Sequence, residues 1–318
     1  MRARKKMVLF FTILLLSVLS FGIFNGYLNA EEPLKVDFAK RSNDIGAASD
    51  SEPVRIAVAA IVSPEETSRF YQDMFDYISK RIDAPVELVQ RKTYQEINDL
   101  IRRNSVDVAF ICSLAYVEGH QQFGMELLAV PVVNGAPVYY SYIIVPKDSP
   151  ATSLRDLKGK VFAYSDPLSN SGKLSPEYLL TQIGANPMNF FGMTFFTYSH
   201  DKSIQAVAEK MVDGAAVDSL VWDYKDATNA KFTSKTKIIS KSLPYGIPPV
   251  VVSKDVNPVL KEKIRKVFLQ MHEDAEGQAI LKSLRIDRFA QADDHQYDSI
   301  REMSSVVKGV IESSKPNQ

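Results

Sequence analysis

Residues that carry most enzyme chemistry are scarce in this 318-residue chain. It has one cysteine, Cys112, and four histidines. A single cysteine excludes an intramolecular disulfide, and its place at the end of the strand-like run 106–112 predicts a small buried side chain rather than a nucleophile. The sequence has no histidine cluster with metal-site spacing, no Gly-x-Ser-x-Gly motif and no phosphate-binding loop with a lysine. We therefore expect no enzyme, no metal and no cofactor.

The chain also lacks an excess of charge of either sign. It has 38 basic and 38 acidic residues, and because residues 1–30 contain four basic and no acidic ones, the remainder has 34 basic against 38 acidic. A mildly acidic protein is a poor partner for nucleic acid or an anionic membrane. If it binds an anion, it must do so through local geometry.

Only one apolar run, 8–24, approaches the length of a membrane span, and it follows the basic residues Arg2, Arg4, Lys5 and Lys6. This pattern is typical of a secretory signal over residues 1–30, with cleavage after Ala30, although the run also suits an uncleaved membrane anchor. Both interpretations place the remainder outside the cytoplasm. The polar, aperiodic residues 31–52 predict a flexible linker.

From residue 54 onward, strand-like and helix-like patterns alternate. Strands are expected at 54–60, 86–90, 106–112, 161–164, 194–197 and 215–217, and capping boxes at 63–66 and 93–96 predict helix starts. Further helices are expected from about Leu174 and from Lys202. The tail from Asn257 is helical in pattern, and its expected core face consists of Val259, Ile264, Val267 and Phe268. Such alternation predicts an α/β fold in which ligands lie where strands end and helices begin.

The two halves of the sequence correspond at an offset of 106 residues. Residues 106–113 (VDVAFICS) match 212–219 (VDGAAVDS), and the same offset pairs Thr93 with Ser199 and Tyr94 with His200. This predicts two similar lobes that each present a polar ring at the start of a helix. The alternative is chance similarity between two ordinary strand-helix-strand units.

A polar turn, 164–172, separates a predicted strand from a predicted helix. Its residues Ser169, Asn170 and Ser171 could cradle an anion at the helix start, where backbone N–H groups and the helix dipole favour negative charge. Gly172 would allow close approach. The alternative is an ordinary helix cap, where serine and asparagine are also preferred.

Three other polar residues are candidates for the same site. We expect His200, at a helix start, to donate a hydrogen bond and to be favoured in its positive form beside a dianion; the alternative is an exposed capping histidine. Tyr139 and Tyr140 are adjacent on a strand, so at most one reaches a cleft. Asp218 could accept a proton from a singly protonated oxyanion, or simply cap the next helix. Ser169, His200 and Asp218 could also be drawn as a hydrolase triad.

These segments resemble the periplasmic binding proteins of phosphonate, phosphite and phosphate ABC importers over the chain after residue 53. The matching pieces are 106–110, Asp166-Pro167-Leu168-Ser169-Asn170-Ser171-Gly172, 199–201 and 246–249. The resemblance implies a type II periplasmic binding protein fold, with two Rossmann-like α/β lobes joined by a two-strand hinge and a ligand cleft between them. Lobe 1 would span 53–142 plus 246–315 and lobe 2 would span 143–245, with hinges near 142–145 and 243–246.

The resemblance also implies which residues bind the ligand. Phosphoryl oxygens would be held from one lobe by Ser169, Asn170, Ser171 and His200, and the other lobe would close with Tyr94 and Tyr139. The positions that align with the acidic residues of aminoethylphosphonate binders are Leu220 and Ile247, both apolar, which favours phosphate, phosphite or an alkyl phosphonate. A slip of that alignment would bring in Asp218 or Asp223 instead.

The partner implied is a membrane permease of an ABC importer, and we expect a monomer. Two alternatives use the same clamp or the same residues. The first is a ligand sensor that reports to a receptor or kinase. The second is a phosphate-ester hydrolase.

Overall fold

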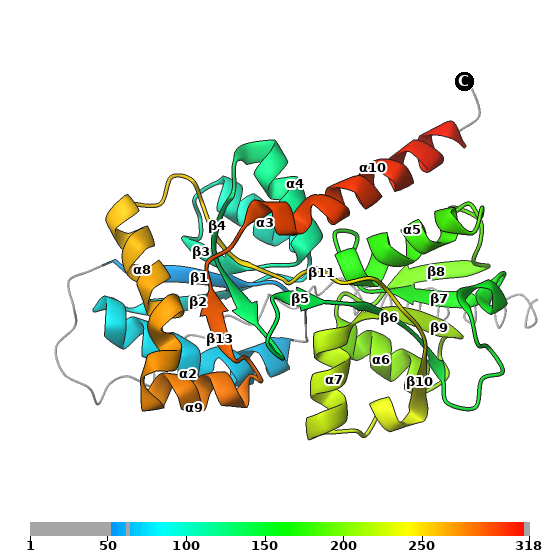
Figure 1. Ribbon diagram of the computed structural model, residues 1–318, viewed down its shortest axis with the longest axis horizontal. Helices are drawn as coiled ribbons and strands as arrows, with labels where there is room; N and C mark the ends of the chain where they lie inside the picture. Colours follow the sequence, from blue (N-terminus) through cyan, green and yellow to red (C-terminus); the bar gives the residue numbers. More distant parts are fainter. Residues whose placement is uncertain (1–51, 62–63, 315–318) are drawn as a thin grey trace, which may run out of the picture. The chain divides into compact units, whose positions relative to one another are not determined.

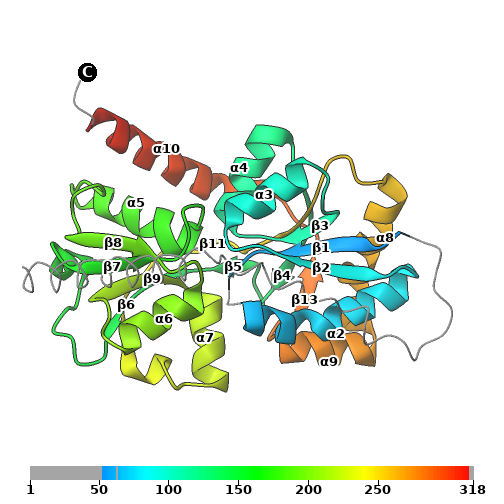
Figure 2. The same ribbon diagram turned by 180° about the vertical axis from the view of Figure 1, so that it is seen from behind.

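The computed structural model describes residues 52–61 and 64–314 and builds them around two large mixed sheets (Figures 1 and 2). The first sheet has the order β13-β4-β12-β3-β1-β2. Its strands are β1 (Val54–Val58), β2 (Val86–Gln90), β3 (Val108–Phe110), β4 (Glu126–Val132), β12 (Val250–Val252) and β13 (Arg288–Ala290). Its helices are α2 (Pro64–Ile82), α3 (Tyr94–Arg102), α4 (Ser113–Phe123), α8 (Pro258–Gln270), α9 (Ala275–Ser283) and α10 (Asp298–Ser313).

The second sheet has the order β10-β6-β9-β7-β8. Its strands are β6 (Ser141–Pro146), β7 (Val161–Tyr164), β8 (Met193–Phe196), β9 (Gly214–Asp218) and β10 (Thr236–Lys241), and its helices are α5 (Ser175–Gln182), α6 (His200–Ala208) and α7 (Ser219–Thr228). Helices cover both faces of each sheet (Figure 1). The expected α/β class is confirmed.

A short two-stranded sheet lies between the large ones (Figure 1). It pairs β5 (Val138–Tyr139) with β11 (Tyr245–Gly246) in antiparallel fashion. The chain enters the second sheet at Ser141, because Ser141 and Tyr142 already pair with β9. The segment 142–145, expected as the first hinge, therefore lies inside β6, and the crossing is at residue 140.

The two sheets repeat one plan at the offset seen in the sequence. Helices α3 and α6 each have nine residues and start 106 positions apart, and the starts of α4 and α7 are also 106 positions apart. Asp107 accepts a hydrogen bond from the backbone N–H of Arg55 at 2.8 Å, and Asp213 accepts one from Val161 at 2.8 Å, so an aspartate fixes the same strand pair in each half. This shared bonding supports a structural repeat over chance similarity.

Several helix boundaries follow from local capping, and some differ from expectation. Thr93 and Glu96 form the predicted capping box of α3, with Thr93 Oγ1 accepting from the Glu96 N–H at 3.2 Å. The box predicted at 63–66 includes Ser63, which lies outside the described residues. The helix expected from Lys202 begins two residues earlier, at His200. Val259, expected in the core, is 77% exposed, since α8 buries Ile264 and Phe268 on its other face.

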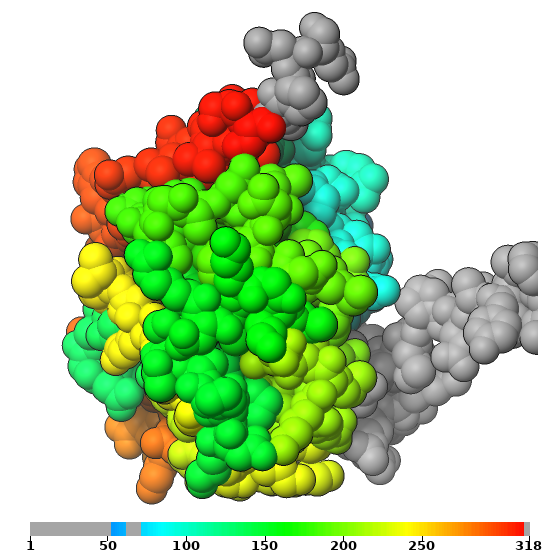
Figure 3. All heavy atoms as spheres, turned by 90° about the vertical axis from the view of Figure 1, so that its right-hand side faces the viewer, coloured from blue at the N-terminus to red at the C-terminus, as the bar shows by residue number. Residues whose placement is uncertain are grey.

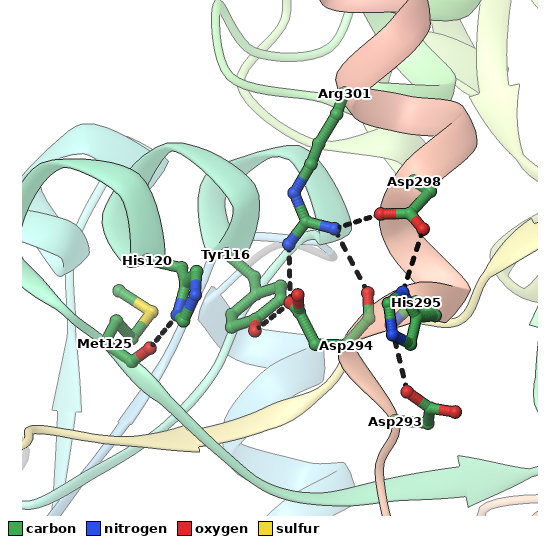
Figure 4. Close-up of polar contacts among 8 residues, drawn as sticks. All are labelled: Tyr116, His120, Met125, Asp293, Asp294, His295, Asp298 and Arg301. Atoms are coloured by element: carbon green, nitrogen blue, oxygen red, sulfur yellow. Dashed lines mark hydrogen bonds and ion pairs between the residues drawn. The ribbon is translucent and has the colours of Figure 1, made fainter.

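The last helix, α10, connects the two halves. Its start is fixed to α4 by Tyr116, whose hydroxyl donates to Asp294 at 2.6 Å, and by Arg301, which bonds both Asp294 and Asp298 (Figure 4). From there α10 runs over to pack against α5 of the second half (Figure 3).

Candidate anion-binding site

The three candidate anion-binding residues of the polar turn that follows β7 are fully buried, whereas Pro167 of the same turn is exposed. Ser169, Asn170 and Ser171 have no exposed surface. Ser169 Oγ accepts from the Gly172 N–H at 2.9 Å, and residues Asn170–Leu174 then form a π-helical turn that leads into α5. Such turns are rare and frequent at functional sites. The helix expected from Leu174 thus begins as a wider turn, which aims successive backbone and side-chain groups into the interior.

The first half of the molecule meets this turn directly. The Asn170 N–H donates to Cys112 Sγ at 3.3 Å, and Asn170 Nδ2 donates to the Tyr139 hydroxyl at 3.0 Å. Nearby, the Tyr94 N–H donates to Asp166 Oδ2 at 3.2 Å. The turn is therefore joined to α3, α4 and β5, all of which lie outside its own sheet.

His200 is buried at the start of α6 and is held as the neutral form. Its Nδ1 accepts from the Asp218 backbone N–H at 3.0 Å, so the ring proton lies on Nε2, which is left to donate. The Ser165 hydroxyl also lies 3.0 Å from Nδ1. Burial lowers the pKa of His200 to about 3. The positive form was expected beside a dianion; without one, this geometry favours the neutral imidazole, because protonating Nδ1 would break the bond from the Asp218 N–H.

Asp218 caps α7, as one of the two interpretations predicted. Its Oδ1 accepts from the Leu220 N–H at 2.7 Å. Burial raises the pKa of this carboxyl to about 7, so that near neutral pH the protonated and ionised forms are both populated. The capping oxygen is engaged, but the group remains able to exchange a proton with an oxyanion, so the structure is compatible with both roles.

Tyr94 and Tyr139 are also buried and lie among the same groups. Both are within electrostatic range of Cys112 and Asp218, and burial raises the pKa of each well above its ordinary value. Tyr140 instead faces Lys241, whose Nζ lies 3.6 Å from its ring centre. Only one of the adjacent tyrosines reaches the interior, as the strand geometry predicted. We call seven residues the socket: Tyr94, Tyr139, Ser169, Asn170, Ser171, His200 and Asp218.

Three socket atoms have unused hydrogen-bonding capacity. Among the described residues, Tyr94 Oη, Asn170 Oδ1 and Ser171 Oγ are buried and have no hydrogen-bond partner. Leaving such groups unpaired costs about 1–3 kcal/mol each, and native proteins rarely do so without a purpose. Turning the Asn170 amide by 180° would let Tyr139 donate to Oδ1 and present Nδ2 as a further donor. Together, these groups suit a small ligand that is rich in acceptors.

Two residues of this region were not singled out as ligand contacts from the sequence. Cys112 contacts Asn170, and the internal offset of 106 pairs it with Asp218, which was the available signal. Ser141 donates to the Ser171 carbonyl at 2.6 Å and so fixes the turn from β6. Over the described ranges, no group of three or more His, Cys, Asp or Glu residues is arranged to hold a metal ion.

Comparison with known proteins identifies the family. Residues 56–297 match the family model described as "ABC transporter, phosphonate, periplasmic substrate-binding protein". The phosphonates-binding periplasmic protein of Escherichia coli (strain K12) is 30% identical over 240 residues, covering 74% of this chain and 70% of that protein. The chain belongs to the periplasmic substrate-binding proteins of phosphonate ABC transporters.

Other members of this substrate-binding family, and solved structures, agree. The probable ABC transporter phosphite binding protein PhnD1 of Prochlorococcus marinus (strain MIT 9301) is 24% identical over 269 residues, covering 80% of this chain and 90% of that protein. The binding protein component of an ABC phosphonate transporter from Pseudomonas aeruginosa superposes with a TM-score of 0.79 at 26% identity, covering 84% of this chain and 90% of that one.

PhnD1 from Prochlorococcus marinus has also been solved in complex with methylphosphonate. That structure superposes on the present chain with a TM-score of 0.74 at 22% identity, covering 80% of this chain and 98% of that one. Likeness at that identity concerns the fold, and it confirms the two-lobed type II architecture. In the part of the chain that the structure describes, no helix is long and apolar enough to cross a membrane. The signal or anchor expected over 1–30 and the linker over 31–52 fall outside these residues, except for Glu52.

Proposed function

We propose that this chain is the extracytoplasmic solute-binding component of an ABC importer and that its socket captures a small phosphorus oxyanion, namely phosphate, phosphite or a phosphonate. The observation that carries the proposal is the group of three buried, unpartnered polar atoms on Tyr94, Asn170 and Ser171. The names of its relatives point to the same ligand class, with phosphonate, phosphite and phosphate all represented.

The socket holds an anion by dipoles rather than by a formal cation. Helices α3 and α6 begin at Tyr94 and His200, and α7 begins immediately after Asp218. Their N-terminal ends carry partial positive charge, which favours an anion. Nε2 of His200 and the hydroxyls of Tyr94 and Ser171 add directed donors around a tetrahedral group.

Capture would involve closure of two lobes about the short central sheet. We propose the lobes 53–140 plus 246–315 and 141–245, with the first boundary moved from 142 to 140 because β6 begins at Ser141, and with the crossing strands β5 and β11 as the hinge. Ser113 Oγ donates to the Gly246 carbonyl at 2.7 Å, and Ser219 Oγ accepts from the Tyr140 N–H at 3.0 Å. These serines are equivalent by the internal repeat, and each ties one crossing segment to the start of a helix beside the socket.

The proposed function also includes export across the membrane and docking on a permease. Residues 1–30 would direct the chain across the membrane as a cleaved signal or an anchor, 31–52 would tether it, and the loaded monomer would dock on the permease. A sensor that reports to a receptor or kinase would use the same clamp. The socket residues are not arranged as a hydrolase triad, because Ser169 Oγ accepts from the Gly172 N–H and His200 Nδ1 accepts from the Asp218 N–H. We therefore expect that phosphate monoesters incubated with the protein release no phosphate.

Calorimetric titration of the purified protein with phosphate, phosphite and methylphosphonate tests the proposal. Ser171→Ala should weaken binding of the preferred anion by about 1–3 kcal/mol, since it strands a charged acceptor. Ser234→Ala, at an exposed serine of the second half, is the matched control and should bind as the unaltered protein does. Failure of all three anions to bind would overturn the proposal.

A further inference from the structure

An apolar pocket of about 210 Å³ opens beside the socket. Its walls come from both halves of the molecule: Val58, Phe110, Val133 and Phe289 belong to the first, and Leu220 and Val221 to α7 of the second. In both ribbon views α7 is the helix of the second half that lies toward the first sheet (Figures 1 and 2). Among its polar lining residues, Asn134, Asp223 and Arg285 are exposed.

The pocket adjoins the socket. Asp218 belongs to the socket and also lines the pocket. Ile61, another lining residue, accepts a hydrogen bond at its carbonyl from the His200 N–H at 3.0 Å. Tyr71, from α2, also lines it, and burial together with the Asp218 charge raises the pKa of Tyr71 to about 12, which places the two side chains within electrostatic range.

From this arrangement we infer that the ligand is a phosphoryl compound with a hydrocarbon substituent of three or more carbons, a chain or a ring, which lies in the apolar pocket while the phosphoryl head lies in the socket. The inference rests on the proposed function and narrows it, because inorganic phosphate and phosphite would leave the pocket without a solute group. An engineered apolar cavity of about 150 Å³ holds benzene, so a pocket of about 210 Å³ has room for a butyl or phenyl group.

The wall chemistry disfavours a substituent that ends in an ammonium group near the head. Burying a cation requires an ionised partner. Asp218 uses Oδ1 to cap α7, and its burial disfavours the ionised form that an ammonium group would need. Asp223 is exposed and accepts a hydrogen bond from the Tyr142 hydroxyl at 3.3 Å. Between these two aspartates in the sequence, the residue that lines the pocket next to the Asp218 cap is Leu220. The geometry therefore suits carbon rather than nitrogen at the second and third atoms from phosphorus.

A chain-length series tests the inference in the intact protein. Calorimetry would compare methyl-, propyl-, butyl- and phenylphosphonate. Each added methylene should raise affinity about fourfold until the pocket is filled, the equivalent of burying one CH₂ group. Equal or weaker binding of butylphosphonate than of methylphosphonate would overturn the inference and leave the proposed function standing, whereas no binding by any phosphonate, phosphate or phosphite would overturn the function itself.

Two further ligands sharpen the result. 2-Aminoethylphosphonate has about the size of propylphosphonate, and tighter binding of the amine would overturn the inference. Butyl phosphate carries the same chain through an ester oxygen. If butyl phosphate binds more tightly than phosphate by the same factor as butylphosphonate over methylphosphonate, the pocket is supported and accepts both linkages. If only butylphosphonate gains affinity, the pocket is supported and the ligand has a direct carbon–phosphorus bond.

Filling the pocket provides the matched variant. Val133→Phe should lower the butyl-to-methyl affinity ratio about tenfold or more while methylphosphonate itself binds within about twofold of the unaltered protein. Val259→Phe, the same change at a residue of α8 that is 77% exposed, should leave the ratio unchanged. Ile286→Phe, at another lining residue, repeats the test if the first variant does not fold. An unchanged ratio in a folded filling variant would overturn the assignment.

Discussion

Tyr94 and His200 occupy equivalent positions in the two halves of the molecule, as the first residues of nine-residue helices 106 positions apart. Cys112 and Asp218 are equivalent in the same way, since each precedes the first residue of the next helix. The repeat thus places a polar ring and a small acidic group on each side of the socket. The two sides have diverged in charge: Asp218 can ionise near neutral pH, whereas burial raises the pKa of Cys112 to about 11.

Tyr94→Phe is expected to lower the affinity for the ligand and to raise the stability of the ligand-free protein. The hydroxyl has no partner among the described residues and is buried, so removing it removes an unmet desolvation cost of about 1–3 kcal/mol. A bound anion would supply that partner, and its affinity should fall by a similar amount. Thermal unfolding without ligand and calorimetry with it measure the two effects in one variant.

Tyr140→Phe is the control for that experiment, because its side chain faces Lys241 rather than the socket. It should change neither quantity by more than a few tenths of a kcal/mol. If Tyr94→Phe instead destabilised the ligand-free protein and left affinity intact, the hydroxyl would have a structural role and the socket would lose one of its donors.

Asp218 and His200 predict opposite pH dependences of stability that offset each other. Burial lowers the pKa of His200 to about 3, below its unfolded value of about 6.5, so its contribution is lost as the pH falls through about 6.5. Burial raises the pKa of Asp218 to about 7, above its unfolded value of about 3.9, so its contribution is present at low pH and is lost as the pH rises from about 4 to 7. Between about pH 4 and 6.5 the two nearly cancel.

Single variants separate the two contributions. In Asp218→Asn, His200 is the member of this pair that still titrates. The free energy of unfolding of the variant, minus that of the unaltered protein, should therefore rise with pH by up to about 1.4 kcal/mol per pH unit between pH 4 and 6. Asparagine retains the helix cap. In His200→Gln the relative slope should have the opposite sign. Denaturant titrations at pH steps from 4 to 7 measure both, and slopes of the same sign would contradict the assigned protonation states.

Ligand binding should raise the midpoint of thermal unfolding. A ligand that binds only the folded state stabilises it by about 2.7 kcal/mol at a hundredfold excess over its dissociation constant. The preferred anion should therefore give a concentration-dependent shift in a thermal scan, and chloride at matched ionic strength should not. Equal shifts with chloride would indicate a general salt effect rather than occupation of the socket.

The sequence predicted the elements of this fold better than their assembly. The capping box at Thr93 and the repeat offset are local patterns, so α3 and the equivalence of the halves could be derived from them. The neutral state of His200 depends on a bond from Asp218, 18 residues away, and on burial, which no local pattern contains. The pocket joins α2, β4, α7 and β13, so its walls could not be assembled from the sequence, although Leu220 was noted as apolar.

Gly172 is the position where the turn tolerates no side chain. A Cβ placed there would lie 1.9 Å from Ser165 Oγ and 2.7 Å from Ser165 Cβ, and Ser165 is itself fixed beside His200. Gly172→Ala must therefore displace the turn or the histidine, and we expect a loss of anion binding of tenfold or more together with a destabilisation of about 1–3 kcal/mol.

The matched control is Gly309→Ala in α10, where an added Cβ meets no atom of the described residues within 4 Å. Alanine at this helical position should stabilise the protein by about 0.5–1 kcal/mol and leave binding unchanged. Adding Ser165→Ala to Gly172→Ala removes the closest clash and should restore part of the stability, which chemical denaturation measures directly. If Gly172→Ala bound the anion as tightly as Gly309→Ala does, the turn would not need its close approach to Ser165, and its place in the socket would have to be abandoned.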